Sequence, residues 1–395
     1  MQCVTYGIHC FTELLNSVLR SVNKIPWAKP TIFGNEKDYV ENAIGSTWLS
    51  DGHYVDKFES DIANLVGCKH GISVSNGTAA LDLGFRALGI TAGDEVVLPG
   101  FGFMAAANVA LQYGAVPKFA EVNKHTWCVD VAALERCITK RTKALVAIHT
   151  YGNVCEMDEI VNLAEEKKIS VIEDGSEAFG STYKGVHVGS FGHLSTFSFQ
   201  ATKTITTGEG GMVLTNDTEL DRMMRLHRNH GMLRKKHYWH EIPGHNYRIT
   251  NLQAAFGCAQ LVNLADIKRE RKRIHHAYKV NLSNLPNCIP QHFDPSVDPM
   301  LWTFAIKLHD LPPGSRDSVL QILKNKGIET RPGFYTPYQM DHIYKSELLP
   351  NCEDVSQNVL SLPTYISLSN DEITWICEEL KCSILELKDK RAGSM

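Results

Sequence analysis

Lys203 lies in the stretch SFQATKTITTGEGG (residues 198–211), between a strand-like SFQ and a glycine-rich turn. A lone lysine in a loop is usually a solvated charge. At the end of a buried strand it can instead be a positioned amine, whose pKa must be lowered by its surroundings before it acts as a base near neutral pH. The role of Lys203 therefore depends on the groups that the fold brings to it.

Lys203 is the first of three polar stretches at predicted strand ends, called stations here. The second station is SVSNGTAAL (residues 73–81), where a strand pattern passes through Ser75, Asn76, Gly77 and Thr78 into a helix pattern. Backbone N–H groups, the helix dipole and a threonine hydroxyl together can cradle a phosphate. The plainer interpretation is a helix N-cap supplied by serine or threonine. The sequence contains neither GxGxxG nor GxxxxGK[ST], so it indicates neither a dinucleotide fold nor a P-loop.

The third station, KISVIEDGSEAFG (residues 168–180), ends an apolar strand pattern with Glu173 and Asp174. A buried carboxylate must find a cation or shift its pKa, although Asp174 alone is equally well explained as a helix N-cap. Pyridoxal phosphate requires a phosphate cradle, a lysine, and a carboxylate that keeps the pyridine nitrogen protonated. The three stations in combination therefore favour a site for this cofactor.

Short apolar runs alternate with helical patterns over residues 70–215, which is typical of repeated βα units and a mainly parallel sheet. Ligands of such sheets bind beyond the carboxyl ends of the strands, where the three stations lie. After residue 264 the pattern changes to a long charged helix, a strand and two further helices. We therefore expect an N-terminal extension (1–29), a large cofactor-binding α/β domain (30–265) and a smaller α/β domain (266–395).

Composition argues for an ordinary enzyme-sized globular protein. The 395 residues are 43% hydrophobic and 21% charged, with a net charge of −4, so no bias toward nucleic acid or an anionic membrane is indicated. The 11 cysteines are odd in number and form no CxxC motif, which favours reduced thiols in the cytoplasm and no metal site. Residues 1–25 lack a signal-peptide pattern, and we expect a short amphipathic helix there, packed or frayed, in an N-terminal segment that packs against the C-terminal part.

Four stretches carry a resemblance to a known family: SNGTAAL, IEDGSEAFGSTYKG, VGSFGHLSTFSFQATKTITTGEGGMVLTND and GHNYRITNLQAAFGCAQL. They resemble the sugar aminotransferases of the DegT/DnrJ/EryC1/StrS type, over about residues 30 to 380. The likeness implies an aspartate aminotransferase-like, fold type I architecture, in which a large domain with a mainly parallel mixed sheet carries pyridoxal 5'-phosphate (PLP). Within the family the chain looks most like the perosamine-forming branch, which aminates C4 of a GDP-linked 4-keto-6-deoxy sugar.

The resemblance also assigns roles to single residues. Lys203 matches the lysine that bonds the cofactor, and Asp174 the partner of its pyridine nitrogen. The remaining matches are Glu177 near the phenolic oxygen, Gly77, Thr78 and Ser198 at the phosphate, Phe103 stacked on the ring, Asn246 reaching the phosphate of a neighbouring subunit, and Arg331 at the substrate. Each of the last four also has a plain reading, as a strand hydroxyl, a core aromatic, a turn residue and a structural arginine.

The sequence departs from the family pattern near the expected sugar site. Gly102 stands where many relatives have threonine, and RPGFYTPYQMDHIY has Gly333, with Tyr338 and Gln339 in place of a histidine. These departures concern the choice of sugar and leave the expected cofactor chemistry unchanged. An acceptor linked to dTDP or UDP, or a cyclitol ketone, therefore stays open as an alternative.

The expected reaction is a two-stage amino transfer from L-glutamate to the keto sugar, with pyridoxamine phosphate as the intermediate form of the cofactor and a homodimer with shared active sites as the working unit. Two rivals are weighed by sequence features. Sugar 3-dehydratases of the family carry histidine in place of the lysine, which Lys203 speaks against. A non-catalytic regulator on the same fold would be expected to carry a basic or nucleic-acid-binding module, which residues 1–25 are too short and too neutral to supply.

Overall fold

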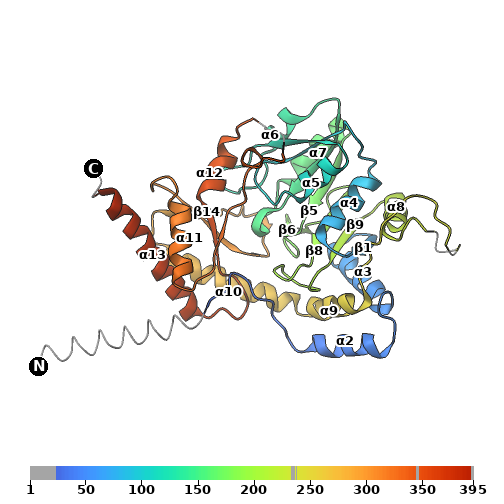
Figure 1. Ribbon diagram of the computed structural model, residues 1–395, viewed down its shortest axis with the longest axis horizontal. Helices are drawn as coiled ribbons and strands as arrows, with labels where there is room; N and C mark the ends of the chain where they lie inside the picture. Colours follow the sequence, from blue (N-terminus) through green and yellow to red (C-terminus); the bar gives the residue numbers. More distant parts are fainter. Residues whose placement is uncertain (1–23, 233–235, 237, 344–346, 393–395) are drawn as a thin grey trace, which may run out of the picture.

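The computed structural model describes residues 24–232, 236, 238–343 and 347–392 (Figure 1). The helix expected over residues 1–25 lies outside these ranges except for its last two residues. Among the helices in the described ranges, none is both long enough and apolar enough to cross a bilayer.

The larger part of the molecule is built on a seven-stranded sheet with the strand order β1-β9-β8-β5-β4-β2-β3. Only β9 runs antiparallel to its neighbours in this sheet, so the prediction of a mainly parallel sheet is confirmed. The strands are β1 (His70–Val74), β2 (Glu95–Pro99), β3 (Val116–Ala120), β4 (Thr142–Ile148), β5 (Ser170–Asp174), β8 (Leu194–Ser198) and β9 (Gly211–Thr215).

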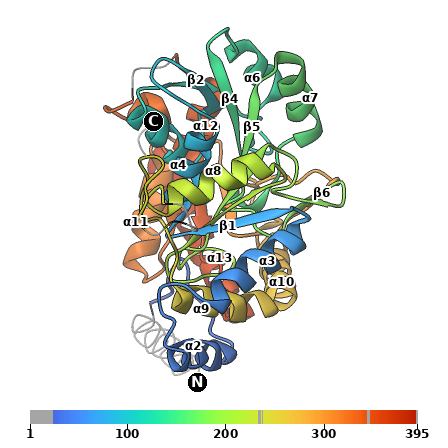
Figure 2. The ribbon, with the colours of Figure 1, turned by 90° about the vertical axis from the view of Figure 1, so that its right-hand side faces the viewer.

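Helices cover both faces of this sheet. Successive residues of a strand point to opposite faces, and here both sets are apolar, so both faces must be covered. Val97 and Val171 pack on the face covered by α3, α6, α7 and α9, whereas Val96 and Ile172 pack on the face covered by α4, α5 and α8. Helix α2 lies outside α9, as Figures 1 and 2 show. The bounds are α2 (Asn35–Gly45), α3 (His53–Val66), α4 (Gly77–Ala87), α5 (Ala105–Gln112), α6 (Val131–Cys137), α7 (Met157–Lys167), α8 (Thr218–Arg228) and α9 (Asn251–Val262).

The strand register fixes which residues meet at the carboxyl edge of the sheet. Gly211, the first residue of β9, pairs with Val74 at the end of β1 and with Ser198 at the end of β8. Asp174, the last residue of β5, pairs with Thr196 in β8. The three stations found in the sequence therefore lie at one edge, on neighbouring strands.

A second core forms around a four-stranded antiparallel sheet in the order β10-β12-β14-β13. Apolar side chains from α10, α11 and α13 cover it, including Ile274, Val319 and Ile376. The elements are α10 (Leu264–Leu282), β10 (Cys288–Pro290), β12 (Phe304–Leu308), α11 (Ser315–Asn325), β13 (Arg331–Pro332), α12 (Pro350–Asn358), β14 (Val359–Leu362) and α13 (Asn370–Ala392). The proposed boundary at residue 265 falls in the first turn of α10, and we keep it as a proposal.

Residues 25 and 27, which precede α2 in the chain, contact this smaller part. Ile25 forms a parallel bridge with Ile328, and the indole N–H of Trp27 donates to Ser361 Oγ at 2.8 Å. The expected packing of the N-terminal segment is thus observed for residues 25 and 27. A short sheet of β11 (Val297–Asp298), β6 (Thr182–Tyr183) and β7 (Val186–His187) links the two parts on another side.

Candidate active site

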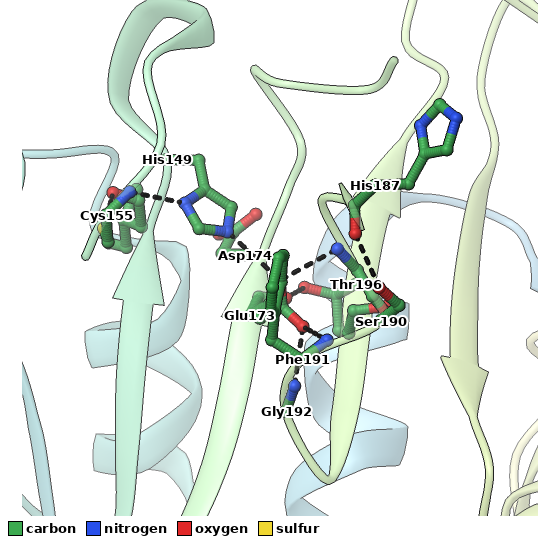
Figure 3. Close-up of polar contacts among 12 residues, drawn as sticks. His149, Cys155, Glu173, Asp174, His187, Ser190, Phe191, Gly192 and Thr196 are labelled. Atoms are coloured by element: carbon green, nitrogen blue, oxygen red, sulfur yellow. Dashed lines mark hydrogen bonds and ion pairs between the residues drawn. The ribbon is translucent and has the colours of Figure 1, made fainter. Parts of the chain in front are cut away.

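The two acidic residues that end β5 point to opposite faces of the sheet, as strand geometry requires. The side chain of Glu173 is fully buried and accepts hydrogen bonds from the N–H groups of Gly189 (2.8 Å), Phe191 (2.7 Å) and Gly192 (2.7 Å). Figure 3 shows this carboxylate between the loop 189–192 and His149. Glu173 therefore anchors the loop that leads into β8.

His149 completes the surroundings of Glu173. Its Nδ1 accepts from the backbone N–H of Cys155 at 3.2 Å, so the ring proton is on Nε2, which lies 3.3 Å from Glu173 Oε2 (Figure 3). A neutral imidazole in this tautomer donates to the carboxylate. The ends of β4 and β5 are thereby tied to the loop that enters the start of β8, behind the edge of the sheet.

Asp174 has fewer partners. Its Oδ1 accepts from the backbone N–H of Ser176 at 3.1 Å, and the residue is only 6% exposed. Within the described residues Oδ2 accepts no hydrogen bond, and it is not among the fully buried polar atoms that lack a partner, so it is open to the site. Burial is the main cause of the raised pKa of the nearby Glu177 carboxyl, and the Asp174 carboxylate adds to it. This oxygen is thus left for a ligand with a proton to share.

The residues predicted from the sequence to cradle a phosphate lie at the start of α4 and the end of β8, and their role stays a prediction. Asn76, and not a serine or threonine, is the N-cap: its side chain accepts from Ala79 N at 2.8 Å. The first N–H groups of the helix, at Gly77 and Thr78, have no partner within a helix. A Cβ at Gly77 would lie 2.9 Å from Ser198 Cβ, so the absence of a side chain keeps the space beside the Ser198 hydroxyl open.

The last glycine of the GEGG turn, Gly211, is required because the start of β9 lies directly against the start of α4. A Cβ at Gly211 would lie 2.5 Å from Asn76 O and 2.9 Å from Gly77 N, so only glycine allows β9 to begin against the start of α4. The glycine-rich turn that drew attention in the sequence is therefore part of the cradle.

Lys203 lies in the loop between β8 and β9. The loop is held by a bond from Lys203 N to Gln200 O at 2.8 Å, and the Gln200 side chain accepts from Thr202 N at 2.8 Å. The ammonium Nζ lies 3.8 Å from Glu177 Oε1 and 4.1 Å from the centroid of the Trp302 ring. With a side chain only 16% exposed, Lys203 is a positioned amine and not a solvated loop charge.

Burial raises the pKa of the Glu177 carboxyl, and the Lys203 ammonium together with the backbone N–H of Tyr151 lowers it again in part. The Tyr151 N–H donates to Glu177 Oε2 at 2.9 Å. Tyr151 has a left-handed backbone (φ 58°, ψ 27°), which is uncommon for a residue with a bulky side chain. This conformation turns its N–H toward Glu177.

An aromatic wall runs from Lys203 to Phe103. Tyr151 is stacked between Trp302, at 6.3 Å between ring centroids, and Phe334, at 5.2 Å. Phe334 in turn contacts Phe103 at 6.2 Å. Phe103 is 62% exposed, so it is not the core aromatic that the plain reading suggests and its ring is open to a ligand.

The two remaining sequence candidates lie further from the lysine. The Asn246 side chain is exposed and accepts from Arg248 Nε at 3.1 Å, while the next residue, Tyr247, accepts from Ser75 N at 2.7 Å through its carbonyl. Arg331 pairs with Glu329 at 2.6 Å. The predicted roles of Asn246 at a neighbouring subunit and of Arg331 at the substrate both stay predictions.

Three residues of this site were not singled out in the sequence: Tyr151, Trp302 and Phe334. Tyr151 carried a usable signal, because HTYG follows directly on the strand KALVAI and so lies at a strand end. Trp302 carried none, since its place beside Lys203 depends on how the smaller part packs. Among the described residues there is no cluster of three or more metal-binding side chains.

Known proteins share this architecture. The sequence profile described as the DegT/DnrJ/EryC1/StrS aminotransferase family matches residues 30–381. The chain is 41% identical over 359 residues to the GDP-perosamine synthase of Escherichia coli O157:H7, covering 90% of this chain and 97% of that protein. It is 39% identical over 362 residues to the GDP-perosamine synthase of Vibrio cholerae, with 90% and 98% covered. Among solved structures, PseC of Helicobacter pylori, an aminotransferase involved in pseudaminic acid biosynthesis, superposes with a TM-score of 0.88 at 28% identity, covering 92% of this chain and all of that one.

Proposed function

This chain belongs to the DegT/DnrJ/EryC1/StrS aminotransferase family, and from that premise we propose that it transfers the amino group of L-glutamate to C4 of a GDP-linked 4-keto-6-deoxyhexose. The enzyme class and the cofactor, PLP with pyridoxamine phosphate as its second form, follow from the family. The choice of a GDP-linked sugar, with GDP-perosamine as the product, is supported by the two GDP-perosamine synthases that share about two fifths of the sequence.

The residues at the edge of the sheet suit PLP. The cradle of Gly77, Thr78 and Ser198 has room where a Cβ would collide, which suits a phosphate held by N–H and hydroxyl groups. The open oxygen of Asp174 suits a protonated ring nitrogen, and the exposed ring of Phe103 suits a flat aromatic partner. When bound, PLP supplies an aldehyde that bonds to amines and a cationic ring that draws electrons from the bonded carbon.

The chain itself contributes proton handling at defined atoms. The Asp174 carboxylate keeps the proton on the ring nitrogen, because an adjacent anion favours the cationic form. Glu177, whose pKa is raised by burial, can share a proton with an oxygen on the ring. Lys203 Nζ, once free, would carry a proton between the two carbon atoms that flank the transferred nitrogen, as a general base and then a general acid. The aromatic wall lines one side of that amine.

The same lysine serves both stages, which is what a two-stage transfer requires. In the first stage Lys203 gives way to L-glutamate, and in the second it handles the proton while the keto sugar receives nitrogen. The single observation that carries the proposal is the placement of Lys203 Nζ 3.8 Å from Glu177, at the strand edge that also holds Asp174.

A homodimer is the second part of the proposal. Four large apolar side chains near α2 are exposed by 47 to 66%: Ile32, Ile44, Trp48 and Leu49. Exposed apolar side chains grouped in this way mark protein interfaces. We expect this surface to contact a second copy, with Asn246 of each copy serving the phosphate of the other.

Light scattering should give twice the mass of the chain, and Trp48→Glu should shift the measured mass toward that of the single chain. A mass equal to one chain for the unaltered protein would contradict the dimer.

The test of the function is a substrate panel. Purified protein with PLP and L-glutamate is offered GDP-, dTDP- and UDP-linked 4-keto and 3-keto sugars and a cyclitol ketone, and 2-oxoglutarate release is measured together with the amino sugar. We expect release with the GDP-linked 4-keto sugar and nitrogen at C4. Release only with another acceptor would overturn the proposed sugar and leave the transaminase intact. No release with any acceptor, with PLP bound, would overturn the amino transfer itself.

A further inference from the structure

The ammonium group of Lys203 lies between two walls that come from different parts of the chain. On one side is the Glu177 carboxylate at 3.8 Å, from the turn after β5. On the other is the ring of Trp302 at 4.1 Å, from the segment that leads into β12. A cation at this distance from the face of an indole is attracted by the ring, and more strongly where water is excluded.

Trp302 is held firmly in this position. Its indole N–H donates to Thr202 O at 2.7 Å, directly before the lysine, and its own carbonyl accepts from the guanidinium of Arg271. The ring of Trp27 meets it edge-on at 5.6 Å and 87°. The Trp302 ring is therefore fixed from three sides before Lys203 is considered.

Tyr151 joins the two walls. Its backbone N–H donates to Glu177, and its ring lies nearly parallel to that of Trp302 at 28°. The left-handed conformation of Tyr151 satisfies both contacts at once. Beyond the ammonium, Lys203 and Arg271 also line a cavity of about 20 Å³, which has room for one water molecule.

We propose that Trp302 is a positioning residue that holds Lys203 in place whenever its amine is not bonded to the cofactor. The proposal rests on the proposed function, because a two-stage transfer leaves the lysine free between the stages. A free lysine side chain loses much rotational freedom when it is fixed, and a held amine starts the next proton transfer already in reach. The ring of Trp302 offsets that loss without bonding to the amine.

A second contact between a lysine and a tryptophan ring in this chain serves as a reference for the contact of Lys203 with Trp302. Lys236 Nζ lies 3.5 Å from the centroid of the Trp239 ring, but Trp239 is 51% exposed whereas Trp302 is 6% exposed. Exposure weakens the attraction of a cation to an aromatic ring. The same contact is thus present twice, once in water and once in the site.

The experiment weakens the ring without changing its shape. Tryptophans with one to four fluorine atoms, which progressively reduce the negative charge on the ring face, are placed at position 302 of the full chain by site-specific incorporation. The protein is briefly treated with isotopically labelled acetic anhydride, with and without added pyridoxamine phosphate, and acetylation of Lys203 and Lys236 is measured by peptide mass spectrometry. We expect Lys203 to react faster with each added fluorine, by more than about 5-fold and up to about 30-fold in total.

Lys236 should keep its rate in these variants. Fluorination at position 239 is the matched control, and it should change the rate of Lys236 by no more than about 5-fold and that of Lys203 not at all. A constant Lys203 rate across the series at position 302, or an equal rise at both lysines, would overturn the proposal. The samples without cofactor report on the Trp302 contact alone, whereas the substrate panel reports on the function, so a failure of one is distinguishable from a failure of the other.

Discussion

Glu173 and Asp174 are neighbours in β5, yet they stand in opposite surroundings. Behind the sheet, Glu173 accepts three backbone hydrogen bonds and faces His149 at 3.3 Å. In front of it, Asp174 accepts one hydrogen bond, from Ser176 N. A buried polar group whose bonds are all made within the chain stabilises the fold, whereas one with an open bond is prepared for a ligand. Residue type alone does not separate the two roles.

The largest effect should come from the front of the sheet. Lys203→Ala removes the amine that handles the proton, and we expect turnover with L-glutamate to fall by about 10⁴-fold or more. Unfolding in denaturant should change little, since the ammonium is partly exposed to the site. Lys203→Arg is the matched control, because it keeps the charge beside Glu177 and Trp302 and should be as inactive. Turnover near that of the unaltered protein in either variant would remove Lys203 from the chemistry.

Behind the sheet the expected effect is on stability. Glu173→Ala leaves three backbone N–H groups buried without an acceptor, and we expect the free energy of unfolding to drop by about 3 to 5 kcal/mol. Glu173→Gln keeps the shape and one acceptor oxygen, so its loss should be smaller. Denaturant titration of both variants measures this. A loss below about 1 kcal/mol for the alanine variant would mean that the loop 189–192 has another anchor.

Asp174→Asn tests whether Asp174 serves activity while its neighbour in β5, Glu173, serves stability. The amide can still accept from Ser176 N, but it carries no negative charge to hold a proton on the ring nitrogen. We expect turnover to fall by about 10²-fold or more, with the free energy of unfolding within about 1 kcal/mol of the original. Steady-state rates and denaturant titration on the same preparation give both numbers. A variant that unfolds easily and still turns over would reverse the assignment of the two faces.

The smallest effect concerns Glu177. Because burial raises its pKa in the folded chain, the folded state binds more protons than the unfolded state above about pH 4.5, and the contribution of this group to stability falls as pH rises through that range. Glu177→Gln should remove this fall in the protein without cofactor. The stability difference between the two proteins, followed from pH 4.5 to 8, should therefore move in favour of the glutamine variant. A constant difference would place the titration elsewhere.

Much of this arrangement could be predicted from the sequence. Apolar runs ending in polar residues predicted a mainly parallel sheet with Gly77, Asp174 and Lys203 at one edge, because strand ends and helix starts are local features. Only the family resemblance singled out Asp174; the strand pattern alone could not separate it from Glu173, since the role of each depends on the loop 189–192 that packs against only one of them. Nor could it find Trp302, whose contact with Lys203 is made by packing between distant parts of the chain.

The pairing of Ile25 with Ile328 has a practical consequence for shortened versions of the protein. Residues 1–29 are predicted to form an N-terminal extension, and within it Ile25 exchanges two backbone bonds with Gly327 and Glu329, while Trp27 touches the ring that faces Lys203. A truncation at residue 30 would therefore remove the backbone hydrogen bonds to Gly327 and Glu329 in the smaller part. It would also remove the contact of Trp27 with the Trp302 ring. Purification tags and protease sites belong upstream of residue 24.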